Sequence, residues 1–230
     1  MAQSQYSFSP SAQLYVRDPR STEVGQALLR EGATLFLELG LEGFTARKLA
    51  ERADTTEATV YKYFKNKHRL LQYYFQLYWM WLEQQIKVFT AVLETPEQRL
   101  IKAVEIICDI PEVAADPGVV SKGTLRELVK SEGAKAYYHV QVDKDNALRL
   151  FSPYKQLVSF VADRIAEVRP GEPFPRSLAT TLVEMAHSLD FYSHHLPSLT
   201  DFPQGAPAGA LKDYIVNLLI QTLHLKSPSS

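Results

Sequence analysis

Residues 45–71 read TARKLAERADTTEATVYKYFKNKHRLL, and this stretch carries the clearest structural signal in the chain. Thr45 can cap a short helix over 46–52, and Thr56 can cap a second over 57–64. Asp54 and Thr55 supply the turn between them. Two short helices joined by such a turn form a helix-turn-helix, in which the second helix enters the DNA major groove and the first crosses the backbone. The stretch therefore predicts a DNA-reading motif.

The distribution of charge favours the same interpretation. The whole chain of 230 residues has a net charge of −1, which alone argues against a strongly basic nucleic-acid-binding protein. However, residues 44–70 hold seven Lys and Arg against three acids, a net of +4, whereas residues 73–230 hold 15 basic and 18 acidic residues. The near-neutral total thus hides a basic segment that coincides with the predicted motif.

Together with the helix before it, this stretch resembles the N-terminal DNA-binding domain of the TetR family of transcriptional repressors. The positions that fall in register with the family pattern are Phe36, Gly43-Phe44-Thr45, Leu49-Ala50, Ala53, Thr59-Val60-Tyr61, Phe64, Lys67 and Leu70-Leu71. Three positions depart from it: Asp54 replaces the turn glycine, Thr55 a valine and Ala58 a glycine. Asp54 is compatible with the turn because Asp adopts the left-handed conformation more readily than most residues.

The resemblance implies a set of DNA-contacting residues. Thr45 would hold a phosphate, Arg47 would reach a guanine edge or a phosphate, and Lys67 would clamp the backbone. Two residues keep alternative interpretations, since Tyr61 is either a phosphate ligand or a packed tyrosine, and Glu57 either faces the groove or stabilises the helix dipole. The full predicted set is Thr45, Arg47, Thr56, Glu57, Thr59, Tyr61, Lys62, Tyr63 and Lys67.

The remaining sequence predicts an all-α protein, because no strand-like alternation appears between turn signals. We expect a flexible arm over 1–20, a three-helix DNA-binding domain over 21–66, a larger helical ligand-binding and dimerisation domain over 67–226 and a tail over 227–230. The first sixteen residues carry no charge and no continuous apolar run, and no segment is long and apolar enough to span a bilayer. A soluble cytoplasmic location is the expectation.

The family resemblance also implies a homodimer that binds a palindromic operator, with half-sites about 34–36 Å or a multiple apart. Apolar stripes on 176–192 and 210–224 are suited to a four-helix interface between two copies. The interface residues predicted on these stripes are Leu182, Met185, Leu189, Ile215, Leu218 and Leu219.

A ligand pocket is predicted in the C-terminal domain from its concentration of aromatic residues. Its candidate lining residues are Phe75, Trp79, Tyr137 and Phe160. Aromatic walls would suit a small apolar or aromatic effector, but the same residues at helical spacing also suit plain core, and the sequence leaves both interpretations open.

Enzymatic and metal chemistry are not expected. No nucleophile elbow, phosphate-binding glycine loop, dinucleotide fingerprint or zinc-protease motif is present, so no catalytic residue, metal or cofactor is assigned. His187, Asp190, His194 and His195 have helical spacing but are interpreted as hydrogen-bonded groups at a helix end. The single Cys108 suits a buried small hydrophobe.

The sequence thus predicts a ligand-responsive transcriptional repressor. Two alternatives remain: a helical small-molecule or lipid carrier that does not act through DNA, and a DNA-binding regulator without a ligand.

Overall fold

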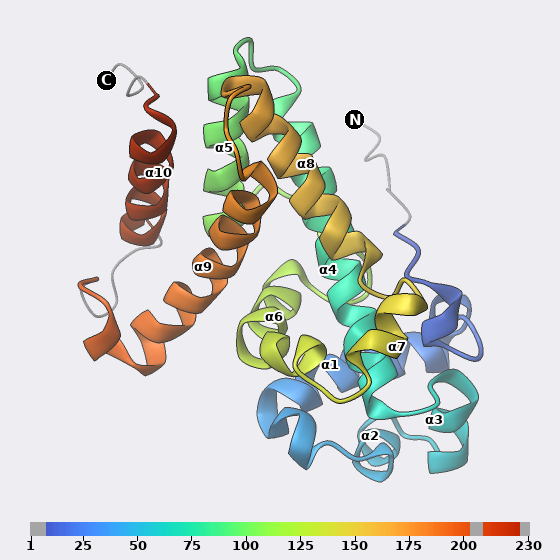
Figure 1. Cartoon of the computed structure of the whole chain (residues 1–230). Coiled ribbons are helices and arrows are strands. Elements are labelled where there is room, and N and C mark those ends of the chain that lie inside the picture. The colour runs from blue at the N-terminus through green and yellow to red at the C-terminus, as the bar shows by residue number, and fades with distance from the viewer. Residues whose placement is uncertain (1–7, 203–208, 226–230) are drawn as a thin grey trace. The chain divides into compact units, whose positions relative to one another are not determined.

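The computed structural model describes residues 8–202 and 209–225, and all regular structure within them is helical (Figure 1). The all-α prediction is confirmed. The α-helices are α1 (Glu23–Gly43), α2 (Ala46–Arg52), α3 (Glu57–Tyr63), α4 (Lys67–Thr90), α5 (Pro96–Cys108), α6 (Lys122–Tyr137), α7 (Val142–Ala147), α8 (Ser152–Val168), α9 (Pro175–His195) and α10 (Gly209–Leu223). Short 3-10 turns occur at Ala12–Leu14, Pro19–Ser21 and Pro197–Leu199.

Helix boundaries follow local chemistry. The hydroxyls of Thr22, Thr45 and Thr56 accept backbone N–H groups from the first turns of α1, α2 and α3, which satisfies donors that a helix cannot pair internally. Thr95 does the same for α5, with Gln98 completing a capping box. Gly40 interrupts α1 with a φ of 65°, and about one further turn follows it before the helix ends at Gly43.

The chain forms two compact units. Unit 1 contains the residues up to Trp81 together with Ala115–Tyr154, and unit 2 contains Leu82–Ala114 and the chain from Lys155 onward. This division differs from the domain boundary expected between residues 66 and 67, because the first half of α4 and helices α6 and α7 belong to the same compact unit as the helix-turn-helix.

Unit 1 has an aromatic core between α1 and α4. The rings of Phe36 and Phe44 stack with centroids 4.1 Å apart, and Tyr74 donates a hydrogen bond of 2.8 Å to the Leu29 carbonyl of α1. Helix α6 packs on α1, where the buried Glu132 carboxylate accepts the Leu41 N–H at 3.0 Å. Helices α4 and α6 therefore both hold α1, the helix that leads into the helix-turn-helix.

Residues 8–22, here named the N-terminal strap, also pack on unit 1. Leu14 and Pro19 are buried, and the Val16 N–H donates to the Tyr63 carbonyl at 2.8 Å. Much of this segment was expected to be a flexible arm. The structure differs because three buried apolar residues, Pro10, Leu14 and Pro19, and several hydrogen bonds hold the segment in place. Their spacing follows neither a helical nor a strand period, so the sequence pattern did not reveal them. Residues 1–7 of the expected arm lie outside the described residues, as do residues 227–230 of the expected tail.

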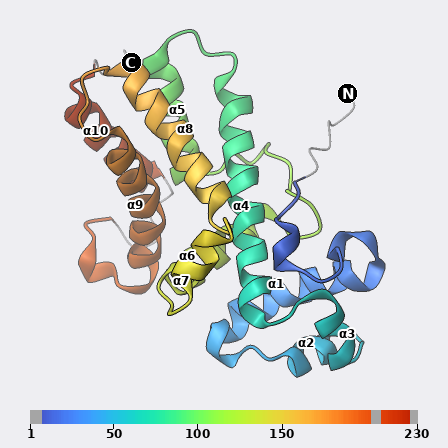
Figure 2. The ribbon, with the colours of Figure 1, turned by 45° about the vertical axis from the view of Figure 1, so that its right-hand side comes forward.

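In unit 2, helices α9 and α10 both pack on α5 (Figure 2). Leu182, Ile215 and Leu219, which were expected at a dimer interface, are at most 1% exposed within the single chain. Helices of the same chain cover these residues. An apolar stripe in the sequence predicts that a helix face is buried, but not whether the same chain or a second copy covers it. Met185, Leu189 and Leu218 remain half-buried. Across the described ranges no helix is long and apolar enough to cross a membrane.

Candidate functional site: a nucleic-acid interface and an aromatic cluster

The helix-turn-helix is built as the sequence predicted. Thr45 accepts the Lys48 N–H at 3.2 Å, and Thr56 accepts the Thr59 N–H at 3.2 Å. Asp54 adopts a φ of 48° in the turn between α2 and α3, a conformation that Asp tolerates better than most residues. The four apolar residues that form the inner face of the motif, Leu49, Ala50, Val60 and Phe64, are buried.

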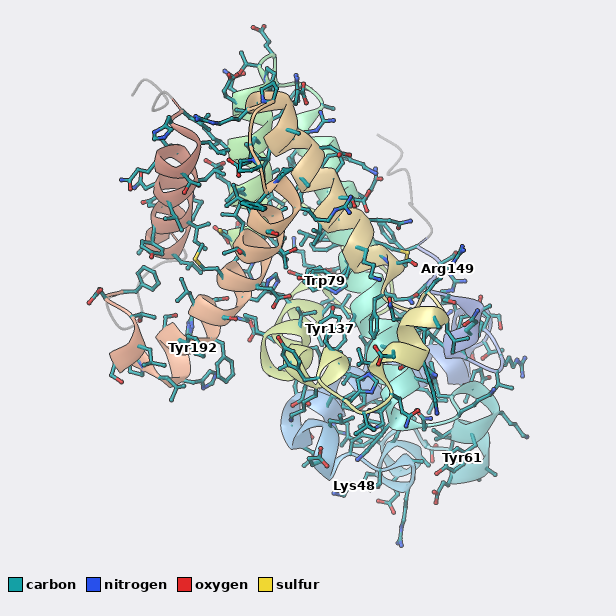
Figure 3. The ribbon with its side chains drawn as sticks, viewed as in Figure 1. Lys48, Tyr61, Trp79, Tyr137, Arg149 and Tyr192 are labelled. Carbon is teal, nitrogen blue, oxygen red and sulfur yellow. The ribbon has the colours of Figure 1, made fainter. Side chains whose placement is uncertain are left out.

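Most of the predicted DNA-contacting residues lie on the outer face of this motif. Thr59 is half-buried, and Tyr61 is 48% exposed, which favours a solvent-facing tyrosine over a packed one. Figure 3 shows Tyr61 on α3 and Lys48 on α2 at this face of unit 1. The exposed members of the predicted set are Thr45, Arg47, Thr56, Glu57, Tyr61 and Lys62.

Two basic residues on this face were not in the predicted set. Lys48 is exposed, and its ammonium donates to the Gly43 carbonyl at 2.9 Å. Lys65 is exposed directly after α3. In the sequence these two residues stand out only by their positive charge, because neither is a position of the family pattern. Arg47 pairs with Glu51 at 3.0 Å with an 80% exposed side chain, and such a surface pair is worth about 0–1 kcal/mol, so the guanidinium is readily released to a phosphate.

Tyr63 differs from its predicted role. It is 3% exposed, and its hydroxyl lies 2.6 Å from the Thr22 hydroxyl. The Arg17 guanidinium lies over its ring, 5.7 Å from the centroid. Because Tyr63 follows Val60 by three residues, the helical period places it on the buried side of α3. It ties α3 to the strap rather than facing DNA.

Lys67 also differs from its predicted role as a backbone clamp. Its ammonium donates to the carbonyl of Leu41 at 2.7 Å and reaches those of Glu42 and Phe44 at 3.4 Å. A cation at the end of a helix satisfies carbonyls that lack intrahelical partners. In this structure Lys67 therefore fixes the start of α4 to the end of α1.

A cleft of about 270 Å³ opens between the start of α2, the outer side of α3 and the start of α4. Phe44, Phe64 and Leu70 contribute apolar walls, while Thr45 and Lys65 contribute polar and cationic groups. A hydroxyl and an ammonium beside an apolar floor suit the sugar-phosphate edge of a nucleic acid, which is contacted through both kinds of group.

Three of the four predicted pocket residues meet in unit 1. The Trp79 indole N–H donates to the Tyr137 hydroxyl at 2.9 Å, and the Phe75 and Tyr137 rings stack 6.5 Å apart. Trp79 and Tyr137 lie next to each other in Figure 3. Phe151 and Tyr154 complete this aromatic cluster. The space between these residues is only about 10 Å³, so in this structure the rings fill their own pocket.

Phe160, the fourth predicted pocket residue, belongs to unit 2. Its ring lies 5.4 Å from the Lys87 ammonium and 5.5 Å from the Arg164 guanidinium. Contacts of this kind are cation–π interactions. Phe160 is thus separate from the aromatic cluster, because a sequence does not reveal which aromatic residues share a compact unit.

A buried polar network lies beside the cluster, at the start of α4. Asp145 is 5% exposed and pairs with Arg69 at 2.8 Å, while the Gln72 amide donates to the same carboxylate at 2.7 Å. Burial, together with the neighbouring His139 and Lys67, holds the pKa of His68 below its usual value. Sequence reasoning missed this network, since its members are far apart along the chain.

The C-terminal histidines bond to their own helix. His187 Nδ1 lies 2.8 Å from the Val183 carbonyl, and His194 Nδ1 lies 2.8 Å from the Asp190 carbonyl. Within residues 8–202 and 209–225, no group of three His, Cys, Asp or Glu side chains is arranged to hold a metal.

The fold and the exposed polar face of α3 define a helix-turn-helix protein of the three-helix type. Residues 28–74 match the family described as bacterial regulatory proteins, tetR family. The match lies over the helix-turn-helix and the helices on either side of it, so the resemblance seen in the sequence is confirmed for these residues. No curated protein matches the chain in sequence.

Solved structures share the fold over most of the chain. AibR in complex with isovaleryl coenzyme A and operator DNA is 17% identical, with a TM-score of 0.60 over 85% of this chain and 97% of that one. The fatty acid degradation regulator FadR from Bacillus halodurans is 17% identical, with a TM-score of 0.61 over 89% and 98%. The ketosteroid regulator KstR2 of Mycobacterium tuberculosis is 15% identical, with a TM-score of 0.54 over 90% and 96%. At these identities the likeness establishes the fold.

Proposed function

We propose that this protein is a DNA-binding transcriptional regulator, acting as a repressor rather than as an enzyme. The observation that carries the proposal is α3, which with its cap residue Thr56 presents Tyr61 and Lys62 to solvent over a buried apolar inner face. Seven residues are enough to lay a helix of about 10 Å in the major groove. Thr45 and Arg47 on α2, with Lys65 after α3, would hold the flanking phosphates.

A homodimer is part of the proposal, since one short helix reads too few bases for a specific site. Met185, Leu189 and Leu218 remain half-buried on α9 and α10 and are available to a second copy, as are the exposed Phe174 and Tyr214. Two copies related by a two-fold axis would require a palindromic operator. Light scattering of the purified chain tests this, and a monomer at micromolar concentration would contradict it.

The effector is proposed to be lipid-like, such as an acyl thioester or another largely apolar molecule. AibR was solved with isovaleryl coenzyme A, and FadR and KstR2 are described as regulators of fatty acid degradation and of ketosteroids. The aromatic cluster of unit 1 supplies the apolar walls that such a ligand needs. Because its present space of about 10 Å³ holds about one water, binding requires the rings to move apart.

That small space also favours a second candidate, a regulator without a ligand whose aromatic residues are all core. Thermal unfolding with isovaleryl coenzyme A and with a longer acyl coenzyme A separates the two. A true effector at about 100 times its dissociation constant stabilises the folded state by about 2.7 kcal/mol. Unchanged melting temperatures with both compounds would favour the second candidate.

DNA binding is tested by fluorescence anisotropy with the DNA upstream of the protein's own gene. Tyr61→Ala should weaken binding about tenfold, which is the cost of one good phosphate or base contact of about 1–3 kcal/mol. Tyr138→Ala is the matched control, because Tyr138 is 87% exposed at the end of α6 and outside the motif. Equal affinities for the two variants would contradict the assignment of α3.

The same assay separates a regulator from a carrier. A carrier that does not act through DNA gives weak, sequence-independent binding that is lost at modest salt concentration. A regulator keeps a sequence-dependent complex.

A further inference from the structure

The N-terminal strap makes hydrogen bonds to two separate places in unit 1. One is Tyr63 at the end of α3, and the other is Gln76 on α4. The Ser11 N–H donates to Gln76 Oε1 at 2.7 Å. Five residues later, the Val16 N–H donates to the Tyr63 carbonyl at 2.8 Å.

Several separate contacts join the strap to the end of α3. Besides the Val16 hydrogen bond, Thr22 pairs with the Tyr63 hydroxyl at 2.6 Å, and Arg17 covers the Tyr63 ring. Phe64 then ends α3, and its ring packs against Tyr73 of α4 at 5.8 Å. The last turn of α3, the helix proposed to enter the major groove, is therefore held by the strap on one side and by α4 on the other.

The strap is itself fixed as a unit between these ends. Leu14 is 1% exposed, and the Arg20 guanidinium both pairs with Asp18 and donates to the Phe8 carbonyl. Gly25 permits the close approach to α1, because a Cβ at that position would collide with the Pro19 carbonyl. The strap is thus fixed to unit 1 at both ends and at points between them.

Gln76 connects the strap to the aromatic cluster. Its side chain is 4% exposed and lines the small space between the rings. Its Nε2 donates to the Leu150 carbonyl at 2.7 Å while its Oε1 accepts from Ser11. A molecule that enters this space therefore meets an amide whose oxygen is bonded to the strap and whose nitrogen is bonded to the Leu150 carbonyl.

We propose that the N-terminal strap is a positioning element for DNA recognition, which links Gln76 in the wall of the aromatic cluster to Tyr63 in the recognition helix. Gln76 and Tyr63 are positioning residues and do not touch DNA. The predicted effect on DNA binding rests on the proposed function. The predicted effect of Gln76 on the stability of the last turn of α3, through the strap, does not depend on that function.

The test uses a pair of substitutions at Ser11 in the full chain. Ser11→Pro removes the N–H that bonds to Gln76, and the Ser11 φ of −51° suits a proline ring. Ser11→Ala is the matched control, because it keeps this N–H while both variants lose the hydroxyl that accepts the Gln13 N–H. Hydrogen exchange of residues 57–64 is measured in both.

We expect Ser11→Pro to speed the exchange of α3 amides about three- to tenfold, the change that loss of one hydrogen bond produces in a local opening equilibrium. Ser11→Ala should leave it unchanged. Gln76→Leu should produce at least this acceleration, because it removes the same bond and also the bond to the Leu150 carbonyl. The double variant Ser11→Pro/Gln76→Leu should not exceed Gln76→Leu alone, because the bond between Ser11 and Gln76 can be lost only once. If Ser11 and Gln76 instead stabilised the fold through unrelated contacts, their effects on the exchange of α3 amides would add in the double variant.

A second pair covers the case in which Ser11→Pro does not fold. Tyr63→Phe removes the hydroxyl paired with Thr22, whereas Tyr74→Phe removes a hydroxyl that bonds to α1 and makes no contact with the strap. Only Tyr63→Phe should speed α3 exchange and weaken binding to a DNA duplex selected by the wild-type chain, each by about three- to tenfold.

Each failure has a distinct result. Equal α3 exchange in Ser11→Pro and Ser11→Ala, or in Tyr63→Phe and the wild type, would overturn the strap inference. A wild-type chain that selects no duplex would overturn the proposed function, and the exchange measurements would still decide the link between Gln76 and α3.

Discussion

Two adjacent tyrosines on α4 should respond in opposite directions to the loss of a hydroxyl. Tyr73 and Tyr74 are both 0% exposed. The Tyr74 hydroxyl donates to the Leu29 carbonyl at 2.8 Å, whereas the Tyr73 hydroxyl has no hydrogen-bond partner in the part of the chain that the structure describes. Both variants remove a buried hydroxyl oxygen from α4. Tyr74→Phe also removes a hydrogen bond, whereas Tyr73→Phe removes none.

The magnitudes follow from the state of each hydroxyl. A buried hydroxyl without a partner costs about 1–3 kcal/mol, so Tyr73→Phe should raise the free energy of unfolding by about 1 kcal/mol. A neutral hydrogen bond contributes about 0.5–1.5 kcal/mol, so Tyr74→Phe should lower it by about 1 kcal/mol. For a chain of this size each change corresponds to about 2–4 °C in melting temperature.

The pH dependence of the free energy of unfolding supplies a second, independent test. Burial raises the pKa of Tyr73 and of Tyr74 above the ordinary value of 10. Above pH 10 the unfolded chain loses these protons while the folded chain keeps them, so the free energy of unfolding falls as the pH rises. Tyr73→Phe removes one such group and should make this alkaline decline shallower.

The assay is urea denaturation followed by circular dichroism at pH 7 and at pH 10.5, on the wild type and both variants. A Tyr73→Phe variant that is less stable than the wild type by 1 kcal/mol or more at pH 7 would refute the reasoning, because it would mean that the Tyr73 hydroxyl makes a stabilising bond. An alkaline decline as steep as that of the wild type would refute the burial argument.

Three further predictions concern the support of the helix-turn-helix. Gly40→Ala should cost about 1–2 kcal/mol in urea denaturation because Gly40 has a φ of 65°, whereas Gly133→Ala in α6, where a Cβ meets nothing, should be neutral or stabilising. Glu132→Leu should cost about 2 kcal/mol, since the backbone N–H that follows Gly40 loses a charged acceptor, and Glu132→Gln should recover part of this loss. Asp145→Ala should cost about 3 kcal/mol in thermal unfolding because Arg69 is left largely buried without its carboxylate, and loss of less than 1 kcal/mol would contradict the importance of the pair.

Features that depend on neighbours in the sequence were predictable. The caps at Thr45 and Thr56 lie where expected, because a cap is a contact between residues three apart. The solvent-facing side of α3 follows for the same reason.

Features that depend on distant partners were not predictable. The stripe containing Ile215 is apolar whether its partner is a second copy or α5 of the same chain, and here it is buried within one chain. The strap has no periodic pattern, so its packing was missed. Phe160 and Trp79 belong to different compact units although both are aromatic and helical.

Lys67 has a consequence for any large mutational scan of this protein. Its ammonium holds the carbonyls of Leu41, Glu42 and Phe44, so substitutions there should lower the amount of folded protein. A scan scored only by gene repression would rank Lys67 beside Tyr61, while a parallel scan scored by protein abundance would separate them. The difference between the two scores at each position would test the proposed DNA-contacting face directly in living cells.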